Sequence, residues 1–350
     1  MLVHVFDNTP HHYHPMRSFF TTQCQISVTQ YFYVKQLNTD GVIENPSSDF
    51  TYYHSCDQLI ELLHRLPRNA TIIFHGIFDL HIWRKLMFSS LLKRSACVIW
   101  GAELYRHNQS KKTIKQHLIQ WFHQLFIRRC KLVIALNQGD ATLVSKLLKR
   151  AKVVVLPYPL IGVQPTEAKI KSKDQPLTIL LGNSAAASNN HLQLLQQIAH
   201  WQQADIHIIA PLNYAGNDEY IEQVKSAGQR LFGDKFQAIT SMLSKTEYDQ
   251  LLASVDLTIF GQQRQQGLYV VYTMLLMGKP MFLLSNTSSY VDLSRLGFQL
   301  FATEQLAEYS VEQLYDLTTS NLAQNKTLMQ EHFTEQALAP KWSALIAEML

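Results

Sequence analysis

The chain has 350 residues, of which 47% are hydrophobic and 17% charged, and its formal net charge at pH 7 is +4. This composition is typical of a folded globular protein and excludes a disordered or collagen-like chain. No apolar run reaches the roughly 18 residues that a membrane-spanning helix needs, so we expect no such helix. The length predicts two domains.

Charge is unevenly distributed along the chain. Residues 1–160 hold 19 Lys and Arg but only 9 Asp and Glu, whereas residues 161–350 hold 12 and 18. The first half is therefore basic, with a net charge of +10, and the second half is acidic, at −6. A basic half predicts contact with an anionic surface.

The N-terminus and the cysteines predict a cytosolic location. Residues 1–6 lack a basic stretch and are predicted to form a first strand instead of a signal peptide. Cys24, Cys56, Cys97 and Cys130 include no C-x-x-C pair, so we expect reduced thiols and neither a zinc site nor a disulfide framework.

Short apolar segments alternate with helical patterns in both halves, which is typical of parallel sheets covered by helices. Segment 157–176 is rich in proline and lysine and is predicted to link the halves. The sequence thus predicts an α/β fold with two doubly wound, Rossmann-like domains, 1–160 and 161–350. The predicted strands are 2–6, 30–34, 71–74, 96–99, 132–136 and 153–156 in the first half, and 177–181, 206–210, 236–239, 257–260 and 281–284 in the second.

Histidines crowd the loop that follows the first strand. Ligands of doubly wound domains bind at the carboxyl ends of the strands, and this loop contains His11, His12 and His14. A neutral imidazole can take a proton from a hydroxyl group. We therefore predict His12 as a catalytic base and His11 as an acceptor ligand. Solvated loop histidines or a metal site are the alternatives, although no second ligand cluster accompanies them.

Two further loops of the first half place a titratable group after a strand. His75 and Gly76 follow strand 71–74, and Glu103 lies in Trp100-Gly101-Ala102-Glu103 after strand 96–99. Glycine lets the backbone approach a ligand closely. His75 is therefore a candidate acceptor ligand, and Glu103 a candidate base. The alternative is a pair of tight turns, the second with an acid that favours the helix dipole.

A basic helix is predicted in the first half. Residues 104–139 include seven Lys and Arg and no acidic residue. Helically spaced apolar side chains predict one apolar and aromatic face, which can lie on an anionic lipid surface. An ordinary packed helix with a solvated basic face is the alternative, and no recognised motif favours nucleic acid as a partner. The residues of this face are Ile114, Leu118, Trp121, Phe122, Leu125 and Phe126.

Two loops of the second half predict a phosphate site. Each follows a predicted strand and precedes a helix, whose free backbone NH groups bind phosphate. A nucleotide-sugar diphosphate is therefore the predicted ligand, and helix capping by Ser188 or Asn189 is the alternative. No D-x-D motif accompanies the loops, so neither a metal ion nor a cofactor is required. The candidate donor ligands are Gly182, Asn183, Ser184, Asn189, Arg264, Gln265, Gln266 and Gly267.

Over most of its length, the chain resembles the TDP-N-acetylfucosamine:lipid II N-acetylfucosaminyltransferases, glycosyltransferase family 56, of enterobacterial common antigen synthesis. It departs at Glu103, where the family pattern looks like Asp, and at Ala185-Ala186-Ala187, where it looks like Gly-Asp-Arg. The matching groups, in order, are Pro10-His11-His12 with Phe19-Phe20; His75-Gly76; Trp100 to Tyr105; Gly182-Asn183-Ser184 with Ser188-Asn189 and His191; Glu219-Tyr220-Ile221 with Gly228 and Phe232; and Arg264 to Gly267 with Gly278 and Pro280.

The resemblance implies a GT-B fold with two domains facing a central cleft. It implies transfer of 4-acetamido-4,6-dideoxygalactose from a dTDP donor, bound by domain 161–350 with Tyr220 as a further ligand. The acceptor, an undecaprenyl-diphosphate-linked saccharide, is implied for domain 1–160, on a peripheral protein at the cytoplasmic face of the inner membrane. An enzyme of the same fold with another nucleotide-sugar donor and a non-catalytic glycan-binding protein are the alternatives.

Overall fold

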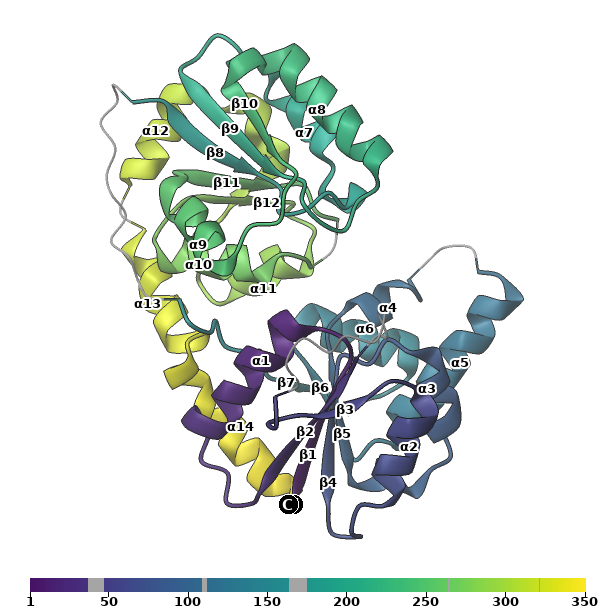
Figure 1. Cartoon of the computed structure of the whole chain (residues 1–350). Helices are drawn as coiled ribbons and strands as arrows, with labels where there is room; N and C mark the ends of the chain where they lie inside the picture. Colours follow the sequence, from purple (N-terminus) through teal and green to yellow (C-terminus); the bar gives the residue numbers. More distant parts are fainter. Residues whose placement is uncertain (37–46, 109–111, 164–174, 264, 321) are drawn as a thin grey trace. The chain divides into compact units, whose positions relative to one another are not determined.

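The computed structural model describes residues 1–36, 47–108, 112–163, 175–263, 265–320 and 322–350. The chain forms two compact units, each with its own parallel sheet (Figure 1). Unit 1 consists of Met1–Gly162 and Thr334–Leu350, and unit 2 of Val163–Phe333. The C-terminal residues therefore belong to unit 1, whereas the sequence placed all of 161–350 in the second domain.

Unit 1 is built on a parallel sheet in which β1 lies between β2 and β4, in the order β3-β2-β1-β4-β5-β6-β7. Strands β1, β4 and β5 are buried along their whole length, as expected for parallel strands covered on both faces. The strands are β1 (Leu2–Phe6), β2 (Gln30–Lys35), β3 (Thr51–Tyr53), β4 (Thr71–His75), β5 (Ser95–Ile99), β6 (Leu132–Ala135) and β7 (Val154–Val155).

Helices cover both faces of this sheet. Val3 and Val5 of β1 pack in one core with Trp83, whereas Leu2 and Phe6 face a second core on the opposite side, which contains helices α1 and α14. The helices of unit 1 are α1 (Pro10–Ser18), α2 (Cys56–His64), α3 (Leu80–Leu86), α4 (Ala102–Tyr105), α5 (Ile114–Arg129), α6 (Gln138–Leu148) and α14 (Glu335–Met349), with a π-helical turn Phe19–Gln23 and a 3₁₀ turn Ser90–Arg94.

Trp342 fixes α14 to unit 1. Its indole is fully buried, its Nε1–H donates to the carbonyl of Pro157 at 2.9 Å, and its ring meets Phe20 edge-on at 5.4 Å. An aromatic side chain of this size contributes a large buried area, and its single polar group is satisfied. The C-terminal helix is therefore an integral part of the second core of unit 1.

Unit 2 repeats the architecture with a parallel sheet in the order β10-β9-β8-β11-β12-β13. Its first strand, β8, again lies between two neighbours, β9 and β11. The strands are β8 (Leu177–Leu181), β9 (Ile206–Pro211), β10 (Phe236–Ile239), β11 (Leu257–Phe260), β12 (Met281–Leu283) and β13 (Phe301–Ala302).

Helix α10, which follows β11, is apolar nearly all round, which matches its burial from Val270 to Leu276. Lys279 lies just after it, buried, and donates to the carbonyls of Leu252, Ala253 and Val255 at the end of α9. The helices of unit 2 are α7 (His191–Gln197), α8 (Asp218–Phe232), α9 (Lys245–Ser254), α10 (Leu268–Leu276), α11 (Ser288–Arg295), α12 (Val311–Thr319) and α13 (Ala323–His332), with 3₁₀ turns Ala187–Asn189, Ala199–Trp201, Gly233–Lys235 and Thr303–Glu308.

The predicted basic helix is α5, but its apolar side chains are not buried to the same extent. The helix begins with a capping box between Thr113 and Gln116. Phe126 is fully buried in the core, whereas Ile114, Leu118 and Trp121 are exposed by 90%, 49% and 45%. The predicted apolar face therefore lies in two environments, because core packing covers only its C-terminal half. Every helix within the described ranges is too short or too polar to span a bilayer.

Candidate functional site

In both sheets the strand order reverses at a central strand, which is where doubly wound domains bind ligands. The chain runs from β1 to β2 and β3 on one side and then crosses back to β4 on the other side of β1. In the same way, it runs from β8 to β9 and β10 and crosses back to β11. The carboxyl ends of strands at such a switch point form a crevice that binds ligands. The predicted site residues of each unit follow these central strands.

In unit 2, the predicted loops are joined by hydrogen bonds. We call residues 182–190 the β8 loop and residues 261–267 the β11 loop. Gln262 Nε2 donates to Asn183 Oδ1 at 2.6 Å, and Ser188 Oγ donates to Gln266 Oε1 at 2.9 Å. Gln262 is 4% exposed, so this link is shielded from water. Gln262 was not among the candidate ligands, and its place two residues after β11 was the signal for its role.

Asn189 holds the β8 loop in shape. Its fully buried side chain donates to the carbonyl of Ser184 at 3.0 Å and that of Ala186 at 3.1 Å, and its Oδ1 accepts from the backbone NH of Asn183. Asn183 Nδ2 donates to the hydroxyl of Tyr214, a residue that the sequence analysis missed. Asn183 and Asn189 thus shape the loop with their own amides.

Gly182 and His191 form the start of the β8 loop and of α7. Gly182 has a φ of +71°, and a Cβ there would lie 2.3 Å from Nε2 of His191. Burial lowers the pKa of His191 to about 4, and its Nδ1 lies 3.2 Å from the hydroxyl of Tyr220. Tyr220, a predicted donor ligand, therefore supports the α7 start in this structure.

The N-terminus of α10 lies at the end of the β11 loop. Its N-cap is Gly267, with a φ of +64°, no side-chain cap and no acidic residue in the first turn. A helix start of this kind presents backbone NH groups to an anion. Gln265 is buried and Gln266 half-buried beside it, whereas Arg264 lies outside the described residues.

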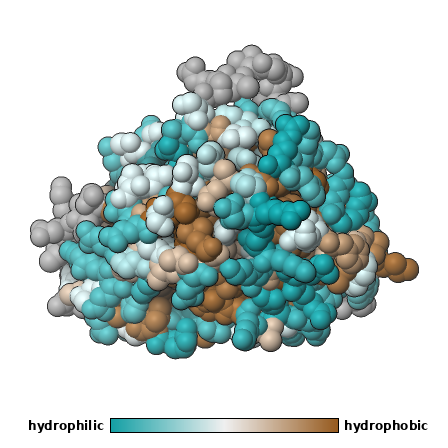
Figure 2. Space-filling model, turned by 90° about the horizontal axis from the view of Figure 1, so that it is seen from below, coloured by the Kyte–Doolittle hydropathy of each residue, from teal (hydrophilic) through white to brown (hydrophobic). Residues whose placement is uncertain are grey.

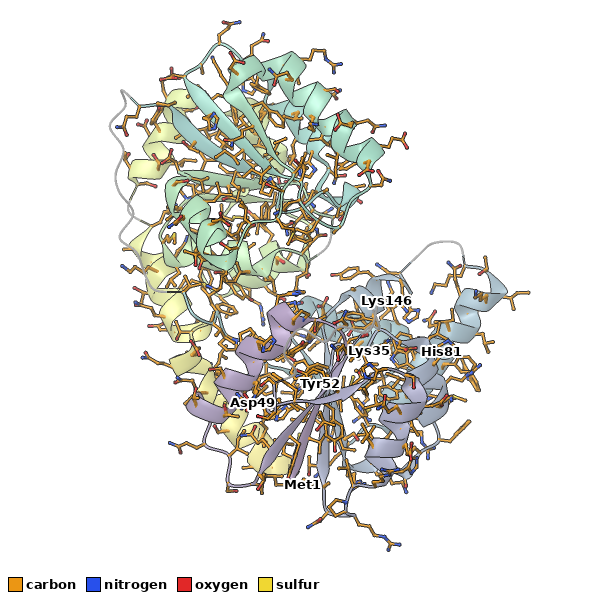
Figure 3. All side chains as sticks on the ribbon, viewed as in Figure 1. Met1, Lys35, Asp49, Tyr52, His81 and Lys146 are labelled. Carbon is orange, nitrogen blue, oxygen red and sulfur yellow. The ribbon has the colours of Figure 1, made fainter. Side chains whose placement is uncertain are left out.

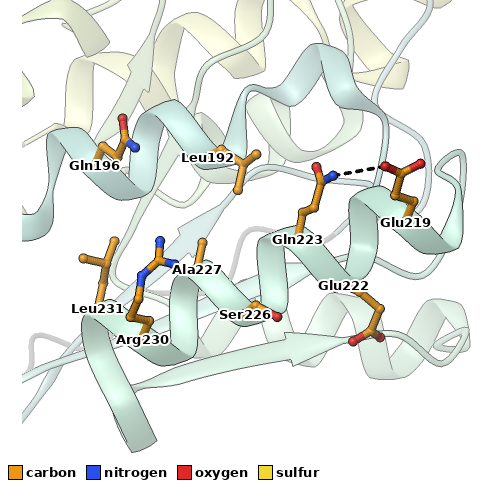
Figure 4. Close-up of a pocket in the computed structure, with 9 residues that line it drawn as sticks. All are labelled: Leu192, Gln196, Glu219, Glu222, Gln223, Ser226, Ala227, Arg230 and Leu231. Carbon is orange, nitrogen blue, oxygen red and sulfur yellow. Dashed lines mark hydrogen bonds between the residues drawn. The ribbon is translucent and has the colours of Figure 1, made fainter.

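A groove of about 570 Å³ runs between α7 and α8 (Figure 4). Leu192 and Ala227 form part of its apolar lining, and Glu219 and Glu222 line it together with Arg230. Its lining residues come from these helices and not from the loops at the carboxyl ends of the strands. It is therefore a different feature from the β8 and β11 loops.

In unit 1, His75 lies in the interior instead of on the surface. It is fully buried at the end of β4, its Nε2 lies 2.9 Å from Nδ1 of His4, and its Nδ1 meets the hydroxyl of Tyr158. Burial lowers the pKa of both histidines, that of His4 to about 3. With both ring nitrogens engaged, His75 has a geometry that favours a structural over a direct ligand-binding role.

Glu103 is also buried, at the start of α4. Its Oε1 accepts from the backbone NH of Trp100 at 2.8 Å, and its Oε2 has no hydrogen-bond partner among the described residues. Burial raises the pKa of Glu103 to about 7, against the lowering effect of the Trp100 hydrogen bond. Asp140, which sequence analysis missed, is buried nearby, where it bonds Tyr105 and Asn137.

His11 and His12 lie in α1, directly after the loop that follows β1, and both are exposed. The two rings are 4.3 Å apart, and His12 meets the ring of Trp100 edge-on at 4.6 Å. Of the two predicted bases, His12 is thus accessible to an acceptor hydroxyl and Glu103 is not. Within the described ranges, no three His, Cys, Asp or Glu residues gather closely enough to hold a metal ion.

Lys35 marks the carboxyl end of β2, opposite the end of the sheet where Met1 lies (Figure 3). Its Nζ lies 3.2 Å from Asp79 and 3.7 Å from Asp7, which follow β4 and β1. These groups bring a mixed-charge cluster to the switch point of unit 1. The sequence analysis did not single them out, although all follow strands at the predicted edge.

Several solved structures share this fold. Sucrose-phosphate synthase from Thermosynechococcus elongatus superposes with a TM-score of 0.74 at 10% identity, covering 100% of this chain and 99% of that one. The lipopolysaccharide outer core galactosyltransferase WaaB gives 0.70 at 10% identity, with both chains fully covered. An E. coli trehalose-6-phosphate structure bound with UDP-2-fluoro glucose gives 0.68 at 10%, covering 100% and 99%.

These likenesses identify two doubly wound domains of the GT-B type. The sequence itself matches one family model, described as 4-alpha-L-fucosyltransferase, glycosyl transferase group 56, over residues 1–347. That match spans both units and includes the β8 and β11 loops. The chain therefore belongs to glycosyltransferase family 56 and is a glycosyltransferase.

Proposed function

We propose that this enzyme transfers 4-acetamido-4,6-dideoxygalactose from a dTDP donor to an undecaprenyl-diphosphate-linked saccharide in bacterial surface polysaccharide synthesis. The observation that carries the donor site is the pair of loops at the β8–β11 switch point, joined by Gln262 and Asn183 beside the start of α10. The choice of dTDP and of the sugar rests on the resemblance of the loop residues to the family.

The donor diphosphate binds at the N-terminus of α10 in this proposal. Backbone NH groups after Gly267, together with Arg264, stabilise the negative charge that builds on the departing diphosphate. Gly182, Asn183 and Ser184 form the opposite wall, with Asn189, Gln265, Gln266 and Tyr220 behind them. Because the loops are joined in the free protein, little reorganisation is needed when the donor binds.

Unit 1 supplies the acceptor site and the base. His12 is exposed and takes the proton of the attacking hydroxyl, while His11 beside it contacts the acceptor. Glu103, the second predicted base, acts from the interior by holding the Trp100 backbone through its Oε1. His75 supports this region from beneath.

The donor is tested by thermal stabilisation with dTDP, UDP, GDP and ADP, because a ligand that binds only the folded state raises its stability according to its affinity. We expect the largest shift with dTDP. A larger rise in melting temperature with another nucleotide would indicate a donor other than the dTDP sugar. No rise with any nucleotide would contradict the donor site. The E. coli structure bound with UDP-2-fluoro glucose supports including UDP in the panel.

The diphosphate role is tested by Arg264→Ala, with Arg230→Ala on the exposed side of α8 as the matched control. Loss of a cation at the leaving group lowers turnover by about 100-fold or more, by analogy with the removal of one oxyanion donor. The control keeps wild-type turnover. Equal activity of both variants would remove Arg264 from the site.

We also propose that the N-terminal half of α5 rests on the cytoplasmic face of the inner membrane. Ile114, Leu118 and Trp121 are exposed and spaced four and three residues apart, so they share one helix face, with Lys115 beside them. Figure 2 shows apolar residues projecting at the right-hand edge, on the side where Figure 1 draws this end of α5. Apolar side chains flanked by cations favour an anionic leaflet.

The membrane proposal is tested by sedimentation with vesicles that contain phosphatidylglycerol. Replacing Ile114, Leu118 and Trp121 by Ser releases the protein into the supernatant, whereas Met242→Ser and Val291→Ser, exposed apolar positions of unit 2, leave binding unchanged. Equal binding of the two variants would contradict a role for α5. Binding to neutral vesicles alone would contradict the anionic surface.

A further inference from the structure

A continuous chain of hydrogen bonds crosses the core of unit 1 on the side of α14. It connects side chains from the segments that follow β5 and β7 to side chains on β4, β1 and β2. The links run from Trp100 Nε1 to the Tyr158 hydroxyl (3.2 Å), from this hydroxyl to His75 Nδ1, from His75 Nε2 to His4 Nδ1 (2.9 Å), from His4 Nε2 to Gln30 Oε1 (3.1 Å), and from Gln30 Nε2 to the carbonyl of Phe20 (3.0 Å).

The two ends of this chain fix the direction of every proton in it. The carbonyl of Phe20 can only accept, so the NH₂ group of Gln30 faces it and the Gln30 oxygen accepts from Nε2–H of His4. At the other end, the indole of Trp100 can only donate, so the hydroxyl of Tyr158 accepts from it and keeps its own proton available to donate to His75.

As neutral rings, the two histidines between these ends satisfy the constraints only with the proton on Nε2. His75 then accepts at Nδ1 from Tyr158 and donates from Nε2 to Nδ1 of His4, which donates onward from its own Nε2. Both rings are fully buried, and burial lowers their pKa values, which favours the neutral form. Every link then has one donor and one acceptor.

The exposed end of the chain is Trp100, which is half-buried and meets His12 edge-on at 4.6 Å. Its position is fixed from a further direction by Gly76, since a Cβ on that residue would lie 2.2 Å from the indole ring. Trp100 is thus held by a hydrogen bond at Nε1 and by close backbone packing against its face. The side chain that it contacts in turn is the candidate base.

We propose that Tyr158, His75 and His4 are positioning residues that act through Trp100 to hold the His12 ring in its catalytic orientation. The inference rests on the proposed function insofar as His12 is the base. It assigns a task to two fully buried histidines and to the half-buried Tyr158. Fixing the orientation of a catalytic group by packing and hydrogen bonds contributes to the rate without changing donor affinity.

A first experiment determines the protonation of the hydrogen-bonded histidines without any substrate. In protein with ¹⁵N-labelled histidine, long-range ¹H–¹⁵N spectra at neutral pH show His4 and His75 as neutral Nε2–H tautomers, with assignments from single His→Gln variants. The ring protons of His12 carry a ring-current shift from Trp100. Tyr158→Phe moves this shift toward the value of an exposed histidine, whereas Tyr315→Phe, which removes a hydroxyl bond to the Gln175 carbonyl in unit 2, leaves it unchanged.

A Nδ1–H or doubly protonated form of either buried ring would contradict the proposed hydrogen-bond directions. An unchanged His12 signal in Tyr158→Phe would contradict the positioning of His12.

The second experiment measures transfer from the dTDP sugar to the lipid-linked acceptor. Tyr158→Phe lowers kcat about tenfold with the donor KM within about twofold, whereas Tyr315→Phe changes neither. Unchanged kcat contradicts the inference. An inactive wild type with intact spectra contradicts the proposed donor instead, so the two failures are distinguishable.

Discussion

The imidazole of His191 faces Gly182 so closely that a Cβ on this glycine would lie 2.3 Å from Nε2. The pair joins the end of β8 to the start of α7, at the first turn of the β8 loop. We predict that Gly182→Ala displaces His191 and, with it, the loop that carries Asn183 and Ser184.

Gly278→Ala is the matched control, because Gly278 has nearly the same φ, +68° against +71°, but a Cβ on it would have no atom closer than 3.8 Å. Both variants carry the cost of a left-handed alanine, about 1–2 kcal/mol. Gly182→Ala adds overpacking of about 1–3 kcal/mol and weakens nucleotide binding. Equal urea midpoints for the two variants would contradict the clash.

Gln262→Ala tests the link between the two loops. The change leaves Asn183 Oδ1 without its 2.6 Å donor in a buried site, at a cost of about 1–3 kcal/mol. We expect nucleotide affinity to fall about tenfold, because the loops must then be ordered on binding. The exposed neighbour Gln263→Ala should behave as wild type. Nucleotide titration by calorimetry separates these outcomes, and identical affinities would argue against the link.

Glu103 predicts a pH dependence of stability. Its pKa rises from 4.5 in the unfolded chain to about 7 on folding, so the folded state binds more protons between these values. Stability therefore falls as pH rises through this window. Glu103→Gln, which keeps an oxygen for the Trp100 NH, should be more stable than wild type at pH 8 and lose that advantage by pH 5.

Urea unfolding at pH 5 and pH 8 measures this difference, with the exposed Glu348→Gln of the same unit as the control. The control should shift neither midpoint. A Glu103→Gln advantage that is independent of pH would mean that the gain comes from packing and not from the proton.

Trp342→Ala tests the attachment of α14. Removing a fully buried tryptophan costs about 3–5 kcal/mol, and the loss should fall on unit 1. Hydrogen exchange read by mass spectrometry should show faster exchange in β1 and β4 and no change in β8 and β11. Trp121→Ala, at a residue 45% exposed, should leave both sheets protected. Faster exchange throughout both sheets would show instead that the two units unfold together.

Much of the fold was readable from periodicity and turn residues. Every strand predicted from the sequence is present, within one residue at each end. The strands that were missed, β3 (Thr51–Tyr53) and β13 (Phe301–Ala302), are short and, unlike the equally short β7 and β12, do not belong to an apolar run of four residues. The return of α14 to unit 1 was unreadable as well, because it depends on contacts of Trp342 with residues more than a hundred positions away.

The site was readable as a set of loops but not as a set of side-chain roles. The rule that ligands bind at the carboxyl ends of parallel strands located the β8 and β11 loops. The position of a residue after a strand does not show how deeply its side chain is buried, however. The sequence therefore did not distinguish the exposed His12 from the buried His75 and Glu103. In the same way, α5 has one apolar pattern but two environments, since Phe126 meets a core and Ile114 meets solvent.

The residues that complete the core of unit 1 are made after the whole of unit 2. During synthesis, the sheet of β1 to β7 leaves the ribosome without Trp342, so the face that α14 will cover stays open while residues 163–333 are translated. Unit 2 is continuous in sequence, so its folding does not depend on residues that are synthesised later. The later half of this enzyme can therefore finish folding before the earlier half, and an aggregation-prone apolar face is exposed for the length of that delay.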